Sequence, residues 1–375
     1  MSVHRRLITR PFDPRDQYPI TMSKSVSRLY IIGAGASVPY RLPTLKTLTW
    51  ELAQTLGKTD RELLARIVYE CFGVTLRARK HSIDFEELLN RLDTSAFEYL
   101  ADTPLGGSNA LRRRAGRLVL AALRRFIRDR CRAASTRKGP YDRLVASLDN
   151  RAAIVSFNWD VLLEMAFRRA GKQFAYLPTS SPADVTVLLK PHGSINWFAL
   201  LDRELLAIDR GGNLEVFGGN LSYYLLYLKN PIGRLDWGSS GHFARMALAP
   251  VPAFVPPGAS RLLSVGGAPR DAFVENGHAQ AMKAIWRTFN ALVESAPEIV
   301  VIGYSIPGTD AASVEMLRHW AGLRGRRRLM LVDPNPSLAG RYRALLNTTV
   351  DVVCNDFRTF DPQVTHPTGR HSVAR

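Results

Sequence analysis

Cysteine is scarce in this chain: its 375 residues include only Cys71, Cys131 and Cys354, with no CxxC pair among them. Three scattered cysteines argue against a disulfide framework and against a structural zinc site, which needs four ligands placed close together. Their small number favours the reducing cytoplasm as the compartment of the protein. Long apolar runs are absent as well, so the sequence predicts no membrane-spanning segment.

Acidic residues are also few, because 33 Asp and Glu stand against 51 Lys and Arg, which gives a net charge of +18. So large a positive charge is typical of a protein with a polyanionic partner, either a nucleic acid or an acidic protein. A phosphate-rich ligand would account for part of it. Direct contact with nucleic acid is the less favoured interpretation, because no recognisable reading module accompanies the charge.

Short apolar runs alternate with helical patterns along most of the chain. Six of these runs are predicted to be buried strands: Arg28–Ile32, Ala152–Phe157, Val185–Lys190, Glu298–Ile302, Leu329–Val332 and Val350–Val353. Continuous apolar strands that alternate with helices indicate a parallel sheet covered on both faces. The sequence therefore predicts an α/β fold with a Rossmann-like, doubly wound parallel sheet of about six strands.

Three segments depart from this alternation. Residues 1–26 are expected to form a basic N-terminal extension without the apolar segment of a secretory signal, and Met22 is an alternative start. Residues 59–148 have helical spacing and predict an inserted helical subdomain, in which Arg112 to Arg132 form an amphipathic, arginine-rich helix. Residues 199–274 are rich in Gly and Pro, which predicts a loop-rich segment with short strands at most.

Every predicted strand but the last ends in glycine or polar residues, where ligands bind in an open parallel sheet. These turns are Gly33-Ala34-Gly35-Ala36-Ser37, Ser156-Phe157-Asn158-Trp159-Asp160, Pro191-His192-Gly193-Ser194, Gly303-Tyr304-Ser305 and Asp333-Pro334-Asn335-Pro336. We expect their side chains to converge on one cleft. Taken alone, the first turn is either a phosphate-binding turn before a helix N-terminus or a tight turn without a ligand. Likewise Asn158 and Asp160 taken alone could merely cap the next helix.

Taken together and in order, four of these turns resemble the motifs of the sirtuin family. The first resembles the GAG-x-S motif, the second the T-x-N-x-D motif, and Lys190-Pro191-His192-Gly193-Ser194 the catalytic HG motif. Gly303-Tyr304-Ser305 looks like the later G-x-S motif that contacts the nucleotide. The resemblance runs from about Ser27 to Phe357 and implies that residues 27–375 form one sirtuin-like, NAD-binding catalytic domain.

The sequence differs from deacylating sirtuins in ways that indicate a particular branch of the family. Deacylating sirtuins carry four zinc cysteines after the HG motif, and here Ala199 to Asn276 contain none. The strings HGSINWF and GYSIPGTD, with the acidic FEELL helix, are more similar to bacterial sirtuin-like domains of antiphage defence that hydrolyse NAD. This resemblance implies an NAD glycohydrolase that yields nicotinamide and ADP-ribose and acts as a triggered effector. NAD would be its substrate, and no metal is expected.

The chemistry of the residues suggests a role for each of them. His192 is expected to act as general base and Asn158 to position a water or a ribose hydroxyl. Asp160 would hold the nicotinamide carboxamide. The remaining predicted nucleotide-binding residues are Gly33, Ala34, Gly35, Ser37, Gly303, Ser305, Asp333 and Asn335.

Two other functions stay open at this point. One is an NAD-dependent protein deacylase or ADP-ribosyltransferase; the other is a non-catalytic NAD or ADP-ribose sensor or an assembly subunit. Control is expected through self-association into a homo-oligomer or through a protein partner, such as a nucleic-acid-handling ATPase or an Argonaute-like protein. The arginine-rich helix or the loop-rich segment would supply the contact surface.

Overall fold

A computed structural model describes residues 25–76, 83–92, 108–176, 185–201, 214–220, 223–228, 272–307 and 310–363. Nearly all of the predicted N-terminal extension, residues 1–26, lies outside these ranges, as does most of the predicted loop-rich segment. Within the described ranges, no helix is both long enough and apolar enough to cross a membrane.

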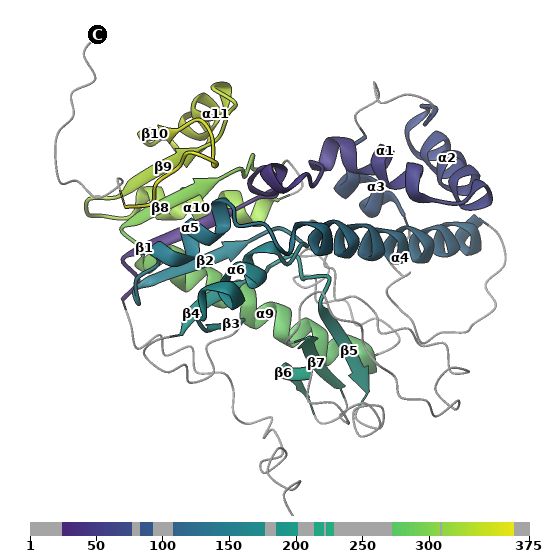
Figure 1. Cartoon of the computed structure of the whole chain (residues 1–375), viewed down its shortest axis with the longest axis horizontal. Helices are drawn as coiled ribbons and strands as arrows, with labels where there is room; N and C mark the ends of the chain where they lie inside the picture. The colour runs from purple at the N-terminus through teal and green to yellow at the C-terminus, as the bar shows by residue number, and fades with distance from the viewer. Residues whose placement is uncertain are drawn as a thin grey trace, which may run out of the picture.

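The centre of the protein is a seven-stranded sheet in the order β10-β9-β8-β1-β2-β4-β3, with all neighbouring strands parallel (Figure 1). Its strands are β1 (Arg28–Ile32), β2 (Ala152–Ser156), β3 (Phe174–Ala175), β4 (Thr186–Leu189), β8 (Glu298–Ile302), β9 (Arg328–Val332) and β10 (Val350–Cys354). The six predicted strands are confirmed, and the two-residue β3 adds an edge. If β3 is left out and the other six strands are numbered along the chain, their order across the sheet is 3-2-1-4-5-6. This is the order of doubly wound dinucleotide-binding sheets.

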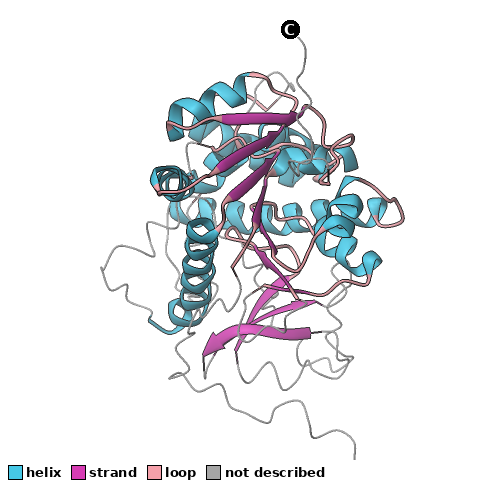
Figure 2. Ribbon diagram, turned by 90° about the vertical axis from the view of Figure 1, so that its left-hand side faces the viewer, coloured by secondary structure: helices cyan, strands magenta, loops and turns pink. Residues whose placement is uncertain are grey.

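Helices cover both faces of this sheet (Figure 2). On one face α5 (Pro140–Ser147) packs against α6 (Leu162–Ala170), and on the other α10 (Ala311–Gly322) packs against both α9 (Ala272–Ser295) and α11 (Ser337–Leu346). This division follows from right-handed crossovers. The chain moves across the sheet in one direction from β1 through β2 to β4, and in the opposite direction from β8 through β9 to β10. The central strands β1, β2 and β8 are buried between the two helical layers, which explains why their sequences are continuous apolar runs.

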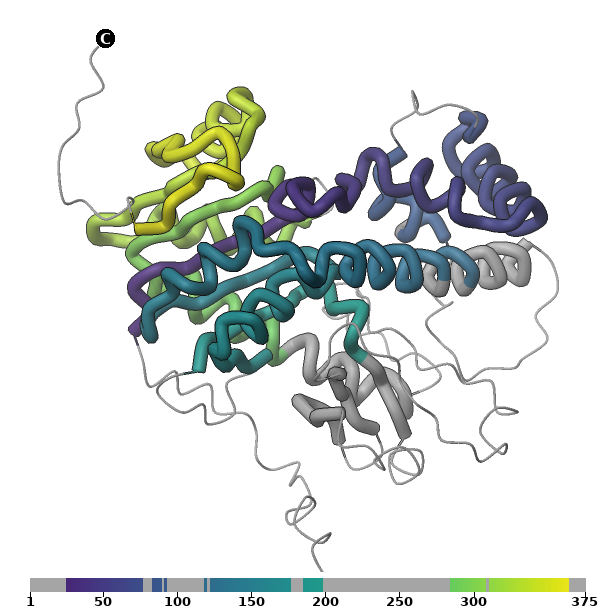
Figure 3. The backbone as a smooth tube through the Cα atoms, in the orientation of Figure 1, coloured from purple at the N-terminus to yellow at the C-terminus, as the bar shows by residue number. Residues whose placement is uncertain are grey.

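A second group of helices lies beyond the carboxyl ends of the strands (Figure 1). It comprises α1 (Leu45–Thr55), α2 (Lys58–Phe72), α3 (Phe85–Arg91) and α4 (Ser108–Ala134), and the chain enters it from β1 and leaves it toward β2 (Figure 3). We call these four helices the helical group. It differs from the insert predicted over 59–148, because α1 belongs to it whereas α5 packs against α6 beside the sheet.

A small antiparallel sheet forms in the segment that was predicted to be loop-rich. Its strands are β5 (Trp197–Leu201), β6 (Leu214–Asn220) and β7 (Tyr223–Leu228), in the order β5-β7-β6. These strands are five, seven and six residues long, which is within the prediction of short strands at most. Two glycines interrupt the apolar pattern of β6 next to a register shift between Val216 and Gly218, which hides the strand from pattern reading.

The register of the sheet brings the turns after β1 and β8 into backbone contact. Ile32 pairs with Ile302, and Gly35 N–H then donates to the carbonyl of Gly303 over 2.9 Å. A Cβ on Gly303 would lie 2.3 Å from the backbone nitrogen of Ala36, and Gly303 also has φ of +59°. The glycines therefore serve this backbone contact. The helix expected directly after the first turn is a 3-10 helix, η1 (Ala34–Tyr40), and not an α-helix.

Replacing Gly303 by alanine should destabilise the protein far more than the same change at Gly171. Both glycines have positive φ, +59° and +63°, but a Cβ on Gly171 would meet nothing within 4 Å. Gly171→Ala should cost about 1 kcal/mol for the left-handed backbone, whereas Gly303→Ala should cost about 4 kcal/mol because backbone atoms must also move apart. Urea unfolding of both variants measures this; equal losses would contradict the proposed contact.

Candidate functional site

A cavity of about 1180 Å³ lies beyond the carboxyl ends of β1, β2, β4, β8 and β9. It is larger than the roughly 300–1,000 Å³ of common small-molecule pockets. All eleven residues predicted from the strand ends line it, namely Gly33, Ala34, Gly35, Ser37, Asn158, Asp160, His192, Gly303, Ser305, Asp333 and Asn335. The parallel register thus gathers side chains from five separate turns around one space.

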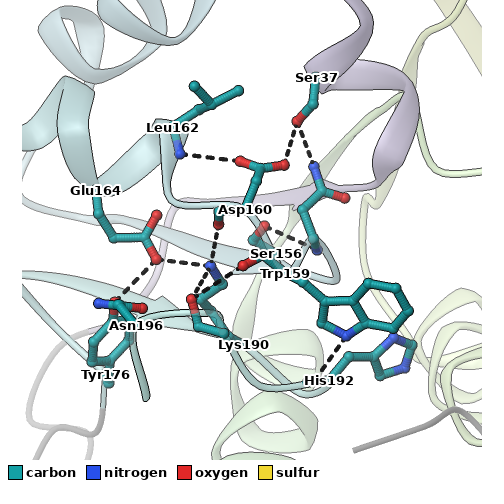
Figure 4. Close-up of polar contacts among 12 residues, drawn as sticks. Ser37, Ser156, Trp159, Asp160, Leu162, Glu164, Tyr176, Lys190, His192 and Asn196 are labelled. Carbon is teal, nitrogen blue, oxygen red and sulfur yellow. Dashed lines mark hydrogen bonds and ion pairs between the residues drawn. The ribbon is translucent and has the colours of Figure 1, made fainter. Parts of the chain in front are cut away.

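At the inner end of the cavity, three predicted residues bond to one another (Figure 4). Ser37 Oγ donates to Asp160 Oδ2 over 2.7 Å, and Asn158 Nδ2 lies 3.1 Å from the same Oγ and 2.9 Å from the carbonyl oxygen of Gly33. The hydroxyl of Tyr141 on α5 lies 3.0 Å from Ser37 Oγ. This network fixes the Asn158 side chain on the turn that follows β1.

Asp160 also has a local structural role. Its Oδ1 accepts a hydrogen bond from the backbone nitrogen of Leu162, the first residue of α6, over 3.1 Å. Burial raises the pKa of its carboxyl group, against the opposing charge of Lys190 and the hydrogen bond from Ser37. Both carboxylate oxygens are therefore engaged within the protein, one at the start of α6 and the other with Ser37.

A buried ion pair joins α6 to the turn after β4 (Figure 4). Lys190 Nζ pairs with Glu164 Oε1 over 2.8 Å, and both side chains are at most 2% exposed. The same ammonium donates to the backbone oxygen of Asp160 over 2.5 Å and to Ser194 Oγ over 2.8 Å. Tyr176 OH donates to Glu164 Oε1 from the other side. These bonds hold the segment that carries His192 against the one that carries Asn158.

The His192 ring lies between two carboxylates. Its Nε2 is 3.1 Å from Asp310 Oδ1, and its Nδ1 is 3.8 Å from Glu86 Oε1 on α3. Phe157 packs edge-on against the ring with centroids 4.9 Å apart. The indole nitrogen of Trp159 donates to the backbone oxygen of His192 over 3.0 Å, which fixes the turn (Figure 4). The ring is therefore rigidly placed.

The charges around His192 set its protonation. Burial lowers the pKa of the imidazole, but the charge of Asp310, the hydrogen bond to it and the charge of Glu86 outweigh burial and raise the pKa above its ordinary value. The site therefore favours the imidazolium to a higher pH than free histidine would. More of the ring is therefore already protonated than in free histidine, which leaves less of it available as the general base that the sequence suggested.

The outer part of the cavity is more open and carries charges of both signs. Ser305 and Asn335 are exposed there, and Asp333 is half-buried with a pKa raised by that burial. Basic residues that the sequence reasoning did not single out also line the cavity, namely Arg41, Lys46, Arg341 and Arg358. The inner end is thus lined by the buried carboxylates of Glu86 and Asp160, and the outer part by these cations together with the carboxylates of Asp84, Glu87, Asp333 and Asp356.

Glu86 and Asp310 are the main site residues that the sequence reasoning missed. Both stand in strings quoted for the family resemblance, FEELL and GYSIPGTD, but no role was given to either. Asp310 is 118 positions from His192 and is held by the hydroxyl of Tyr304, which donates to its Oδ2 over 2.5 Å. A buried position for an acidic residue is invisible in the sequence.

The arginine-rich pattern on α4 is only partly a surface feature. Arg124 is half-buried and its Nε donates to the backbone oxygen of Ile195 over 3.1 Å, behind the His192 turn. Burial and the nearby charge of Arg128 lower the pKa of its guanidinium to about 10. Side chains from Arg112 to Arg117 lie outside the described residues. Part of the positive charge therefore supports the site from within.

No protein-family model matches this chain, and a search of curated proteins returns no relative. Among the side chains that the structure describes, no group of three or more His, Cys, Asp or Glu residues is arranged to hold a metal ion. The geometry of the cavity is therefore the basis of the functional argument.

Breaking the buried ion pair on one side should be far more damaging than replacing both partners. Lys190→Met leaves the Glu164 carboxylate buried without its cation, which should cost about 3–5 kcal/mol in the free energy of unfolding. The double variant Lys190→Met/Glu164→Leu should recover much of this loss, because no buried charge remains. Chemical denaturation of both single variants and the double variant completes the cycle. Additive losses would contradict direct coupling.

The pH dependence of stability should reveal the Asp310–His192 pair. Because the folded pKa of His192 is raised, its contribution is fully present below the unfolded pKa and fades as pH rises through the folded pKa. Asp310→Asn should therefore destabilise the protein most near pH 5 and least near pH 8, titrations in the range of about 5 to 8 being typical of histidine.

A control for this measurement is Glu294→Gln, which removes the exposed carboxylate 3.7 Å from His319. Solvent screens that pair, so the stability of this variant should follow the wild-type pH profile. An Asp310→Asn loss that is constant with pH would show that the carboxylate does not stabilise the imidazolium.

Proposed function

We propose that the protein is an NAD glycohydrolase, which cleaves the bond between nicotinamide and ribose and releases ADP-ribose. The observation that carries this proposal is the convergence of eleven residues from five strand ends on one cavity. The sheet order supports it as well, because dinucleotides bind where the direction of strand progression reverses, and here the turns after β1 and β8 meet at that point.

The distribution of charge in the cavity suits such a substrate. Bond cleavage at C1′ builds positive charge on the ribose, as in glycoside hydrolysis. At the inner end Glu86 and Asp160 line the cavity and Asp310 pairs with His192, and these carboxylates would stabilise that charge. The basic outer residues Arg41 and Arg341 would attract the pyrophosphate. Asp333 and Asn335 would accept hydrogen bonds from the hydroxyls of the adenosine ribose.

Within this proposal, the residues at the inner end position the reacting ribose. Asn158 is fixed by its bonds to Gly33 and Ser37, and His192 by Asp310 and Trp159. Preorganised groups of this kind lower a barrier because they need no rearrangement during the reaction. The leaving nicotinamide takes the electron pair of the broken bond and becomes neutral.

Non-catalytic binding of NAD or ADP-ribose is the second candidate. The observation in its favour is that the polar groups of Ser37, Asn158 and Asp160 already bond to one another, which leaves fewer of them for chemistry. A sensor would bind NAD without turnover, whereas the proposed enzyme binds and cleaves it. A direct assay of products separates the two.

Incubation of the purified protein with NAD, alone and with the product of the adjacent gene, should release nicotinamide and ADP-ribose in equal amounts. His192→Ala and Asn158→Ala should each lower the rate about 100- to 1,000-fold, as the loss of a preorganised group does. Asn158→Ala should also lose about 1–3 kcal/mol of stability, since buried acceptors lose their donor. Chromatography of the products gives the rates.

The matched control is His319→Ala, which removes an exposed histidine outside the residues that line the cavity. Its turnover should equal that of the wild type. A folded His192→Ala protein with wild-type turnover would overturn the proposed mechanism. Binding of NAD without cleavage under every condition would favour the sensor.

A further inference from the structure

We propose that Glu86, on helix α3 of the helical group, holds the attacking water of this reaction and accepts its proton. This inference rests on the proposed function and adds to it the group that makes the reaction a hydrolysis. Glu86 is 4% exposed and lines the cavity together with His192. It is the carboxylate nearest to the ring nitrogen of His192 that faces away from Asp310.

An unsatisfied nitrogen marks the place of the water. His192 Nδ1 is buried and has no hydrogen-bond partner among the described residues. Glu86 Oε1 lies 3.8 Å from it, which is too far for a direct hydrogen bond. Buried polar atoms rarely remain without a partner, so a water that touches both atoms would complete the site.

The other ring nitrogen is already committed. His192 Nε2 faces Asp310 Oδ1 at 3.1 Å, and the second oxygen of Asp310 accepts from Tyr304 OH. Asp310 therefore orients the ring and keeps a proton on Nε2. It acts as a positioning residue, and Nδ1 is left to face Glu86 and the cavity.

Glu86 is held firmly enough for such a role. Asp84 caps α3, with its Oδ1 accepting from the backbone nitrogen of Glu86 over 2.9 Å. Phe85 is fully buried and packs edge-on against Trp159, whose indole in turn bonds to the backbone of His192. Helix and histidine turn are thus joined through a rigid aromatic contact.

Charge decides which group takes the proton. The two neighbouring carboxylates raise the pKa of His192 and favour its imidazolium, which cannot accept a further proton. The carboxylate of Glu86 can. As the C1′–N bond breaks, its electron pair leaves with nicotinamide, the water oxygen bonds to C1′, and one water proton passes to Glu86 and then to solvent.

The test compares Glu86→Gln with Glu70→Gln, which removes an exposed carboxylate on α2 that pairs with Arg66 and does not line the cavity. Glu86→Gln should lower kcat about 100- to 10,000-fold, while calorimetry shows NAD binding close to that of the wild type. Glu70→Gln should match the wild type in both. Circular dichroism checks the fold of each variant.

Chemical rescue separates a base from a merely structural residue. Azide is a nucleophile that needs no deprotonation, so it should restore nicotinamide release in Glu86→Ala and yield the azide adduct of ADP-ribose. It should have little effect on the wild type. Mass spectrometry identifies the adduct.

The results of these assays test the role of Glu86 separately from the proposed function. Wild-type cleavage of NAD with an equally active Glu86→Gln protein would overturn this inference and leave the proposed function standing. A folded Glu86→Ala protein that azide does not rescue, loss of NAD binding in Glu86→Gln, or unfolding of both variants would also overturn it. No cleavage of NAD by the wild type would overturn both proposals.

Discussion

The in-register packing of parallel strand ends is the constraint on which the rest of the structure depends. Because Ile32 lies opposite both Ser156 and Ile302, the turns that follow three strands begin at one level. Two of these turns then touch backbone to backbone, which only glycine allows at Gly303. Both turns line the cavity. A side chain at the contact would push apart the segments that carry the site.

The protein is strongly basic, yet the inner end of its cavity is acidic. The buried carboxylates Glu86 and Asp160 line it. Asp310 is buried against His192, and Glu164 is buried against Lys190. Such an arrangement is costly unless the charges are paired or serve a function. Under the proposed function, these carboxylates would stabilise a ribose that becomes positively charged during bond cleavage, while the outer cations would bind phosphate.

The helical group is part of the site and not an appendage of the sheet. It contributes Glu86 through α3, and α4 supports the histidine turn through the bond from Arg124 to Ile195. The proposed centre is therefore assembled from two bodies of helices and strands joined by aromatic packing between Phe85 and Trp159. The distance between Glu86 and His192 therefore depends on where α3 lies against the histidine turn.

The sequence by itself determined the six main strands, their parallel class and the residues at their ends. Apolar runs and terminal polar residues are local patterns, and parallel strands must present their ends at one edge. Tertiary structure alone decided the partners of those residues. Glu86 and Asp310 meet His192 from distant elements, and their burial depends on how α3 and α10 dock. The small sheet of β5, β6 and β7 and the inward turn of Arg124 likewise follow from packing between segments, which no local pattern encodes.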